Sequence, residues 1–102
     1  MPVRNLRRSY AYIPHITATS VTYNIEVRLS NHEKPDELGV CWSTEASPSV
    51  STADHMIADG QVSIYTFVIE NLTPGTHYYV NGFFKYDSIY YYILTQITTP
   101  TE

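Results

Sequence analysis

The sequence predicts an all-β fold, an antiparallel sandwich or barrel of about seven strands, because strand patterns recur along it and helix patterns do not. The chain has 102 residues, the length of one such domain. Ten tyrosines accompany many valines, isoleucines and threonines, the residue types that strands prefer. No stretch keeps a 3.6-residue apolar period over the length that a helix needs.

The first two strands are predicted at residues 10–17 and 21–29. Pro14 interrupts the first one, and because proline is tolerated mainly on edge strands, we expect this strand at the edge of its sheet. Apolar and polar residues alternate throughout the second, the pattern of a half-buried strand. Its predicted inward residues are Val21, Tyr23, Ile25, Val27 and Leu29.

A third strand is predicted at residues 38–43, with Val40 and Trp42 on one face and Cys41 on the other. We expect Cys41 on the outer face of its sheet, partly covered, as a small structural residue and not as a reactive thiol. Residues 44–60 are rich in Ser, Thr, Ala, Asp and Pro, which predicts a long connection with at most one short edge strand.

Three more strands are predicted at residues 63–69, 77–86 and 89–99. The first two are separated by a proline- and glycine-containing turn at 72–76, and Asp87-Ser88 turns the chain into the last strand. The aromatic residues expected in the core are Tyr23, Trp42, Tyr65, Phe67, Tyr78 and Phe84.

The charge distribution disfavours a nucleic-acid partner. The net charge is −4, and three of the six basic residues, Arg4, Arg7 and Arg8, stand at the start of the chain. Residues 9–102 therefore keep three bases against ten acids, a balance that repels phosphate backbones. We expect residues 1–9 to be a solvated basic segment or linker and residues 10–102 to form the domain. No run is apolar enough to insert in a membrane.

Nothing in the sequence assembles a catalytic or metal-binding site. Asp54 and His55 adjoin with serines nearby, but adjacent residues rarely point the same way. The histidines are scattered without the short spacing of metal ligands: His15, His32, His55 and His77. We therefore predict a protein that is not an enzyme and has no cofactor and no bound metal.

Two stretches resemble the fibronectin type III family, the immunoglobulin-like sandwich of about seven strands. These are Gly39-Val40-Cys41-Trp42-Ser43, similar to the family's third strand, and Leu72-Thr73-Pro74-Gly75-Thr76-His77-Tyr78-Tyr79-Val80, similar to its corner before the sixth strand. The resemblance implies that Trp42 is a structural core residue and that the Tyr78 hydroxyl bonds back to upstream backbone.

These two stretches, together with the long Ser/Thr/Asp/Pro connection between them, are similar to a bacterial variant found as repeated modules in large surface and secreted proteins. It implies a non-catalytic binding or spacer module, extracellular or at the cell surface as part of a longer exported protein. An odd number of strands would place the two ends of the domain at opposite poles. Because the basic start of the chain is not followed by an apolar run of signal-peptide length, an intracellular protein is the other interpretation. The Arg-Gly-Asp tripeptide is absent, so integrin binding is not implied.

The last predicted strand does not alternate between apolar and polar residues, because residues 89–94 are apolar or aromatic on both faces. We expect an outer aromatic surface that binds a protein partner or a second copy of the chain. Its residues are Tyr79, Phe83, Tyr90, Tyr92 and Leu94. Two alternatives stay open: the N-terminal segment or a neighbouring domain covers this surface, or exposed tyrosines stack on the sugar rings of a glycan.

Overall fold

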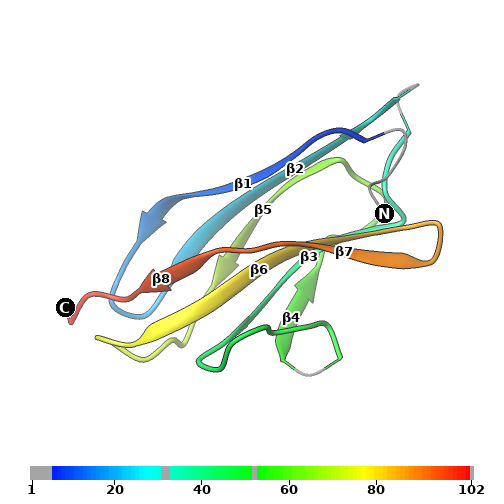
Figure 1. Cartoon of the computed structure of the whole chain (residues 1–102). Helices are drawn as coiled ribbons and strands as arrows, with labels where there is room; N and C mark the ends of the chain where they lie inside the picture. Colours follow the sequence, from blue (N-terminus) through cyan, green and yellow to red (C-terminus); the bar gives the residue numbers. More distant parts are fainter. Residues whose placement is uncertain (1–5, 31–32, 52, 102) are drawn as a thin grey trace.

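The computed structural model, which describes residues 6–30, 33–51 and 53–101, confirms the antiparallel β-sandwich (Figure 1). A smaller sheet has the strand order β1-β2-β5, and a larger sheet has the order β4-β3-β6-β7, with β8 also paired to β6. The strands are β1 (Leu6–Ile16), β2 (Val21–Leu29), β3 (Glu37–Ser43), β4 (Asp54–Ile57), β5 (Ile64–Ile69), β6 (His77–Tyr86), β7 (Ile89–Ile93) and β8 (Gln96–Thr98). The described residues contain no helix long and apolar enough to cross a membrane.

Strands β7 and β8 are two parts of one edge strand. The structure therefore has eight strands where about seven were predicted. On β6, Gly82 pairs with Ile93 of β7, and Tyr79 pairs with Gln96 of β8. Tyr79 lies three residues before Gly82, and Gln96 lies three residues after Ile93, so both strands pair with β6 in the same register. Between them the Val80 N–H donates to the Thr95 carbonyl at 2.9 Å. In Figure 1 the two arrows follow one another along the same side of β6.

Strand β1 lies at the edge of the smaller sheet, as its proline predicts, but it is longer than the sequence suggested. It begins at Leu6, which pairs with Leu29 at the far end of β2. Residues 6–9 therefore belong to the sheet, because β2 offers them a full-length partner, and the boundary we placed after residue 9 was wrong. Residues 1–5 lie outside the described part of the chain. The register shifts between Tyr12 and His15, at Pro14, where the backbone donor is missing.

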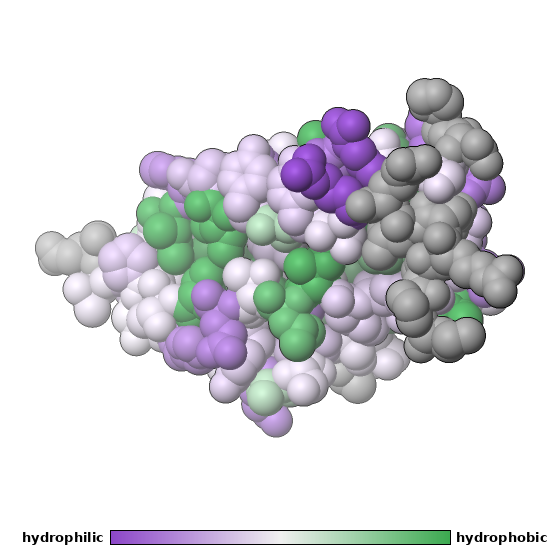
Figure 2. Space-filling view, turned by 45° about the horizontal axis from the view of Figure 1, so that its top comes forward, coloured by the Kyte–Doolittle hydropathy of each residue, from purple (hydrophilic) through white to green (hydrophobic). Residues whose placement is uncertain are grey.

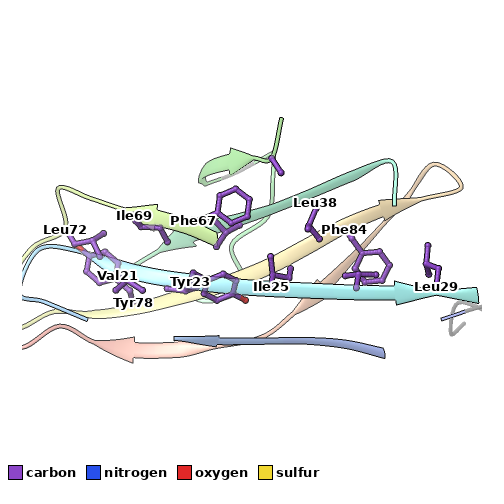
Figure 3. Packing of buried hydrophobic residues seen from close by; sticks show 14 residues of the cluster. Val21, Tyr23, Ile25, Leu29, Leu38, Phe67, Ile69, Leu72, Tyr78 and Phe84 are labelled. Atoms are coloured by element: carbon purple, nitrogen blue, oxygen red, sulfur yellow. The ribbon is translucent and has the colours of Figure 1, made fainter. Parts of the chain in front are cut away.

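The core lies between the two sheets, and the five inward residues predicted on β2 are all buried in it (Figure 3). From the other strands the core includes Phe67, Tyr78 and Phe84, as predicted. Two expected core residues are less covered. Tyr65 is 37% exposed because it stands on an edge strand, and its ring packs against Phe67 with 4.6 Å between the ring centroids. Trp42 packs against the core but stays partly exposed near the end of β3.

Both predicted turns have the required backbone. Asp87 and Ser88 have φ values of 52° and 65°, the two positive angles of a tight hairpin between β6 and β7. At the corner before β6, Gly75 has φ 61°. There the Thr73 N–H donates to the Tyr78 hydroxyl at 2.8 Å, a bond from that hydroxyl to upstream backbone as the resemblance implies.

Candidate interaction face

The candidate face is the outer face of the larger sheet, and Phe83 lies at its centre. Strand alternation places Phe83 there next to Tyr92, its partner on β7. Its ring lies 5.8 Å from the ring of Tyr90 and 6.1 Å from that of Tyr92, measured between centroids, and the side chain is fully buried. Our expectation that Phe83 belongs to the exposed surface was therefore wrong, because the two tyrosines cover it.

Gly39 makes room for this ring from the strand on the other side. Gly39 pairs with Phe83, and a Cβ at this position would stand 2.3 Å from the Phe83 Cζ atom and 2.5 Å from the Met56 carbonyl oxygen. A side chain would therefore displace the ring or the backbone of β4. A glycine inside a strand often marks a place where another group approaches closely, and the sequence shows Gly39 in such a position. The sequence does not show that this group is Phe83, because that depends on the register between β3 and β6.

The connection between β3 and β4 covers the middle of the face. The Asn81 amide donates to the Pro48 carbonyl at 3.2 Å, and the Val50 N–H donates to the Tyr92 hydroxyl at 3.2 Å. Cys41 on β3 is fully buried, and not partly covered as we expected, with its thiol directed at the Asn81 carbonyl at 3.6 Å. Burial raises the pKa of this thiol to about 11.

At the hairpin end of the face, Tyr90 is fixed by a charged pair. Its hydroxyl donates to Glu37 Oε1 at 3.1 Å, and Lys85 lies 3.9 Å from Glu37 Oε2 and 5.4 Å from the centre of the Tyr90 ring. Burial, together with the hydrogen bond to the Glu37 carboxylate, raises the pKa of the Tyr90 hydroxyl. The ring is therefore held in one place and remains partly exposed.

The accessible part of the face is thus narrower than predicted. Leu94 is 77% exposed, while Tyr79, Tyr90 and Tyr92 are partly buried. Ile57 of β4 is also exposed on this face opposite Gly39, and sequence reasoning missed it because the region was interpreted mainly as a loop. The structure therefore places Tyr90 and Tyr92 over the buried ring of Phe83, whereas Tyr79, Leu94 and Ile57 lie elsewhere on the same outer face.

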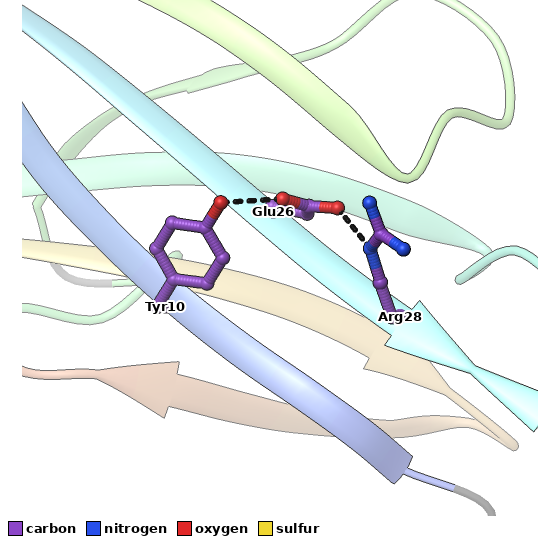
Figure 4. A network of polar contacts seen from close by, with 3 residues as sticks. All are labelled: Tyr10, Glu26 and Arg28. Carbon is purple, nitrogen blue, oxygen red and sulfur yellow. Dashed lines mark hydrogen bonds and ion pairs between the residues drawn. The ribbon is translucent and has the colours of Figure 1, made fainter.

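A second pair of exposed tyrosines, Tyr10 and Tyr12, lies on the outer face of the smaller sheet, and Figure 4 shows the polar contacts of Tyr10. Tyr10 donates to Glu26 Oε1 at 2.6 Å, and Arg28 donates to the other carboxylate oxygen. These two hydrogen bonds hold the pKa of Glu26 below its usual range. The Tyr10 and Tyr12 rings are stacked with centroids 6.3 Å apart and 14° between their planes, and Tyr12 is 52% exposed.

Hydrophobic side chains do not merge into one large surface in the view of Figure 2, where they form separate groups among paler and more hydrophilic ones. This view brings forward the top of Figure 1, where β1 and β2 lie. Isolated groups of this kind are usual on protein surfaces, so size alone does not identify a binding site on the part of the surface shown in this view.

The polar residues considered for catalysis do not converge in the described part of the chain. Asp54 and His55 are consecutive on β4, paired with Trp42 and Cys41, so they point to opposite faces. The His55 ring is hydrogen-bonded to the Ala53 carbonyl at 3.2 Å. Both line a hollow of about 600 Å³ together with Trp42. Among the described residues, no group of three His, Cys, Asp or Glu side chains could hold a metal ion.

No protein-family model and no curated protein matches this sequence. Solved structures do match. A computationally redesigned β-sandwich protein has a TM-score of 0.63 and 20% identity, covering 99% of this chain and 94% of its own. The FN1–FN3 domains of chicken CNTN1 have a TM-score of 0.65 and 13% identity, covering 97% of this chain and 33% of theirs. The chain has a fibronectin type III-like fold. At these identities the similarity concerns the fold alone.

Proposed function

We propose that this fibronectin type III-like domain is a non-catalytic binding or spacer module of a larger protein, and that it binds a protein partner through the outer face of the larger sheet. The observation that carries the proposal is Leu94, a leucine 77% exposed beside two partly exposed tyrosines on an edge strand. Tyrosine-rich surfaces around an apolar residue are typical of protein interfaces.

The rigidity of the tyrosines supports this function. The Tyr90 hydroxyl is held by Glu37, and the Tyr92 hydroxyl by the Val50 N–H, so neither ring is free to rotate away. A surface whose side chains are already ordered loses less conformational entropy when it binds. The two rings also rest on Phe83, which fixes their height above the sheet.

The positions of the two ends of the domain support a spacer role. Strand β1 begins opposite Leu29 of β2, whereas β8 ends opposite His77 of β6. His77 follows the corner at residues 72–76, where the Leu72 N–H donates to the Thr19 carbonyl. These are the two ends of a body 44 Å long and 20–23 Å wide (Figure 1). Domains can therefore be joined end to end, and we propose an extracellular or cell-surface setting in a longer exported protein.

The decisive test compares Leu94→Asp with Ile89→Asp. Both residues are exposed and lie on or next to β7, but strand alternation points them to opposite faces. We expect Leu94→Asp to abolish binding on an array of secreted and cell-surface proteins, while Ile89→Asp binds like the wild type. Equal binding by both variants, with the partner still captured, would rule out this face.

A glycan-binding module is the second candidate, and the stacked pair Tyr10 and Tyr12 favours it. The exposed face of a tyrosine ring is an apolar surface on which a sugar ring can stack, and the planes of these two rings are only 14° apart. These rings lie on the smaller sheet, so the two candidates use different faces. A glycan array that gives a signal with the wild type and none with Tyr12→Ala would support this function. Retention of the signal by Tyr12→Ala would exclude it.

A further inference from the structure

Strand β5 is an edge strand that lacks the usual protection. Its residues, Ile-Tyr-Thr-Phe-Val-Ile, include no charge and no proline, and its register with β2 has no shift. Ile64 is 61% exposed and Val68 is 48% exposed. The edge strand β1, in contrast, contains Arg8 and a register shift at Pro14. Unprotected apolar edges of this kind accept another strand.

The hydrogen-bonding groups on the open side of β5 follow from its ladder with β2. The Val27 N–H donates to the Ser63 carbonyl at 2.8 Å, in the same register as the pairs Ile25–Tyr65 and Tyr23–Phe67. In an antiparallel ladder, alternate residues bond to one neighbouring strand. The backbone groups of Ile64, Thr66 and Val68 therefore point away from β2, where the smaller sheet has no further strand among the described residues.

We propose that β5 pairs antiparallel with β5 of a second copy of the chain, about a two-fold axis at Thr66. Thr66 then lies opposite Thr66 of the second copy, and Ile64 lies opposite Val68. All three residues offer both backbone groups, so about six hydrogen bonds join the copies. Threonine pairs and β-branched pairs are favourable cross-strand neighbours.

The proposed register also keeps each side chain on its proper face. Phe67 and Ile69 are buried toward the core, whereas Ile64, Thr66 and Val68 lie on the exposed face. Pairing an even-numbered residue with another even-numbered residue keeps both cores on the same side of the joined sheet. A register shifted by one residue would turn the core of one copy toward the solvent. A two-fold centred on Ile64 or Val68 would overlap fewer residues.

One strand pair buries less surface than a standard protein interface, so we expect a dimer that forms only at high protein concentration, roughly micromolar or above. The outer face of the larger sheet remains free in this dimer. Failure of the dimer and failure of the proposed partner binding are therefore separate results.

The test uses Thr66→Lys and Thr66→Glu in sedimentation velocity. Each variant alone places like charges opposite each other at the two-fold axis, and we expect its self-association to be at least tenfold weaker than that of the wild type. An equal mixture places lysine opposite glutamate and should recover association. Thr22→Lys and Thr22→Glu are matched controls, because Thr22 is next to Val68 on the same face but on the central strand. They should associate like the wild type.

Three results would overturn the proposal: a wild type that stays monomeric up to about 1 mM, Thr66 variants that associate like the wild type, or a mixture that shows no recovery. A strand from a different protein binding to β5 while the chain alone stays monomeric would also exclude the second copy. A further variant, Thr66→Pro, removes only the N–H that faces the second copy. It should be folded, with an unchanged β2–β5 ladder by hydrogen exchange, and monomeric.

Discussion

At the scale of single residues, Gly39 has no room for a side chain in the candidate face. An added Cβ would meet both the Phe83 ring and the Met56 carbonyl at less than 3 Å, and a backbone carbonyl on a paired strand moves little. We expect Gly39→Ala to lower the free energy of unfolding by about 1–3 kcal/mol, as overpacking does. Urea denaturation measures this loss.

Gly60→Asn is the control for the glycine substitution. Gly60 has φ +80° with open space around it, and asparagine tolerates such angles. Its change in unfolding free energy should stay within about 0.5 kcal/mol. If Gly39→Ala were as stable as the wild type, the ring of Phe83 would not lie over this strand.

The predicted role of Tyr78 at the corner before β6 can be tested by removing its hydroxyl group alone. Tyr78→Phe removes the hydroxyl that accepts from the Thr73 N–H, without changing the ring in the core. We expect a loss of about 1 kcal/mol in unfolding free energy, the usual net value of one hydrogen bond. Tyr79→Phe, on the next residue and the opposite face, should change stability little. An equal effect of the two substitutions would contradict the corner role.

At the scale of strands, the sequence predicted correctly which residues of β2 point inward and where the turn before β7 lies, because these features depend on residue alternation and on turn chemistry. Strand β2 was predicted with its full inward set, because its polar and apolar residues alternate without interruption. The turn at Asp87-Ser88 was predicted from residue types that tolerate positive φ. Both signals are local, so no knowledge of other strands was needed.

Coverage could not be predicted in the same way, because alternation gives the face of a residue and not what lies above it. Phe83 was correctly assigned to the outer face, but its burial depends on two tyrosines of β7 and on Gly39. Cys41 is buried where Pro48 and Val50 of the β3–β4 connection bond to Asn81 and Tyr92, and nothing in that polar segment indicates this contact. Binding of a partner by the candidate face therefore remains a prediction.

The strand β7 carries a prediction that follows from this coverage. Replacing both Tyr90 and Tyr92 with serine removes the rings over Phe83 and the acceptor for the Val50 N–H. We expect the domain to fold but to lose about 2–4 kcal/mol of unfolding free energy, as for other large-to-small changes at covered sites. Tyr12→Ser, at an exposed ring on the smaller sheet, should cost little. If the double variant lost nothing, Phe83 would have another cover.

At the scale of the whole molecule, the structure separates three surfaces. The outer face of the larger sheet has the fixed tyrosines, and the two ends of the long axis carry the chain ends. On the side of β5 away from β2, the backbone groups have no partner strand among the described residues. A domain placed in a row can therefore use its sides for partners while its ends connect to neighbours. The acidic body, with three bases against ten acids in residues 9–102, gives no reason to expect nucleic acid on any of them.

Cys41 allows the opening of the whole molecule to be measured. It lies on β3, between β4 and β6, and is fully buried with a thiol pKa of about 11. Since the thiolate is the reactive form, we expect native protein at pH 8 to react with a thiol reagent at least a hundredfold more slowly than protein in urea. Ala46→Cys, exposed in the β3–β4 connection, should react rapidly in a Cys41→Ser background.

The same thiol gives a pH dependence with a defined sign. Its native pKa of about 11 is above the value of 9.0 expected for the exposed group, so the native state holds the proton more tightly. This contribution to stability is complete below about pH 9 and decreases as the pH rises toward 11. Urea denaturation of the wild type and of Cys41→Ser between pH 7 and pH 10.5 should show a steeper alkaline loss for the wild type. Parallel curves, or rapid labelling of Cys41 at pH 8 without urea, would mean that the β3–β4 connection does not close over β3.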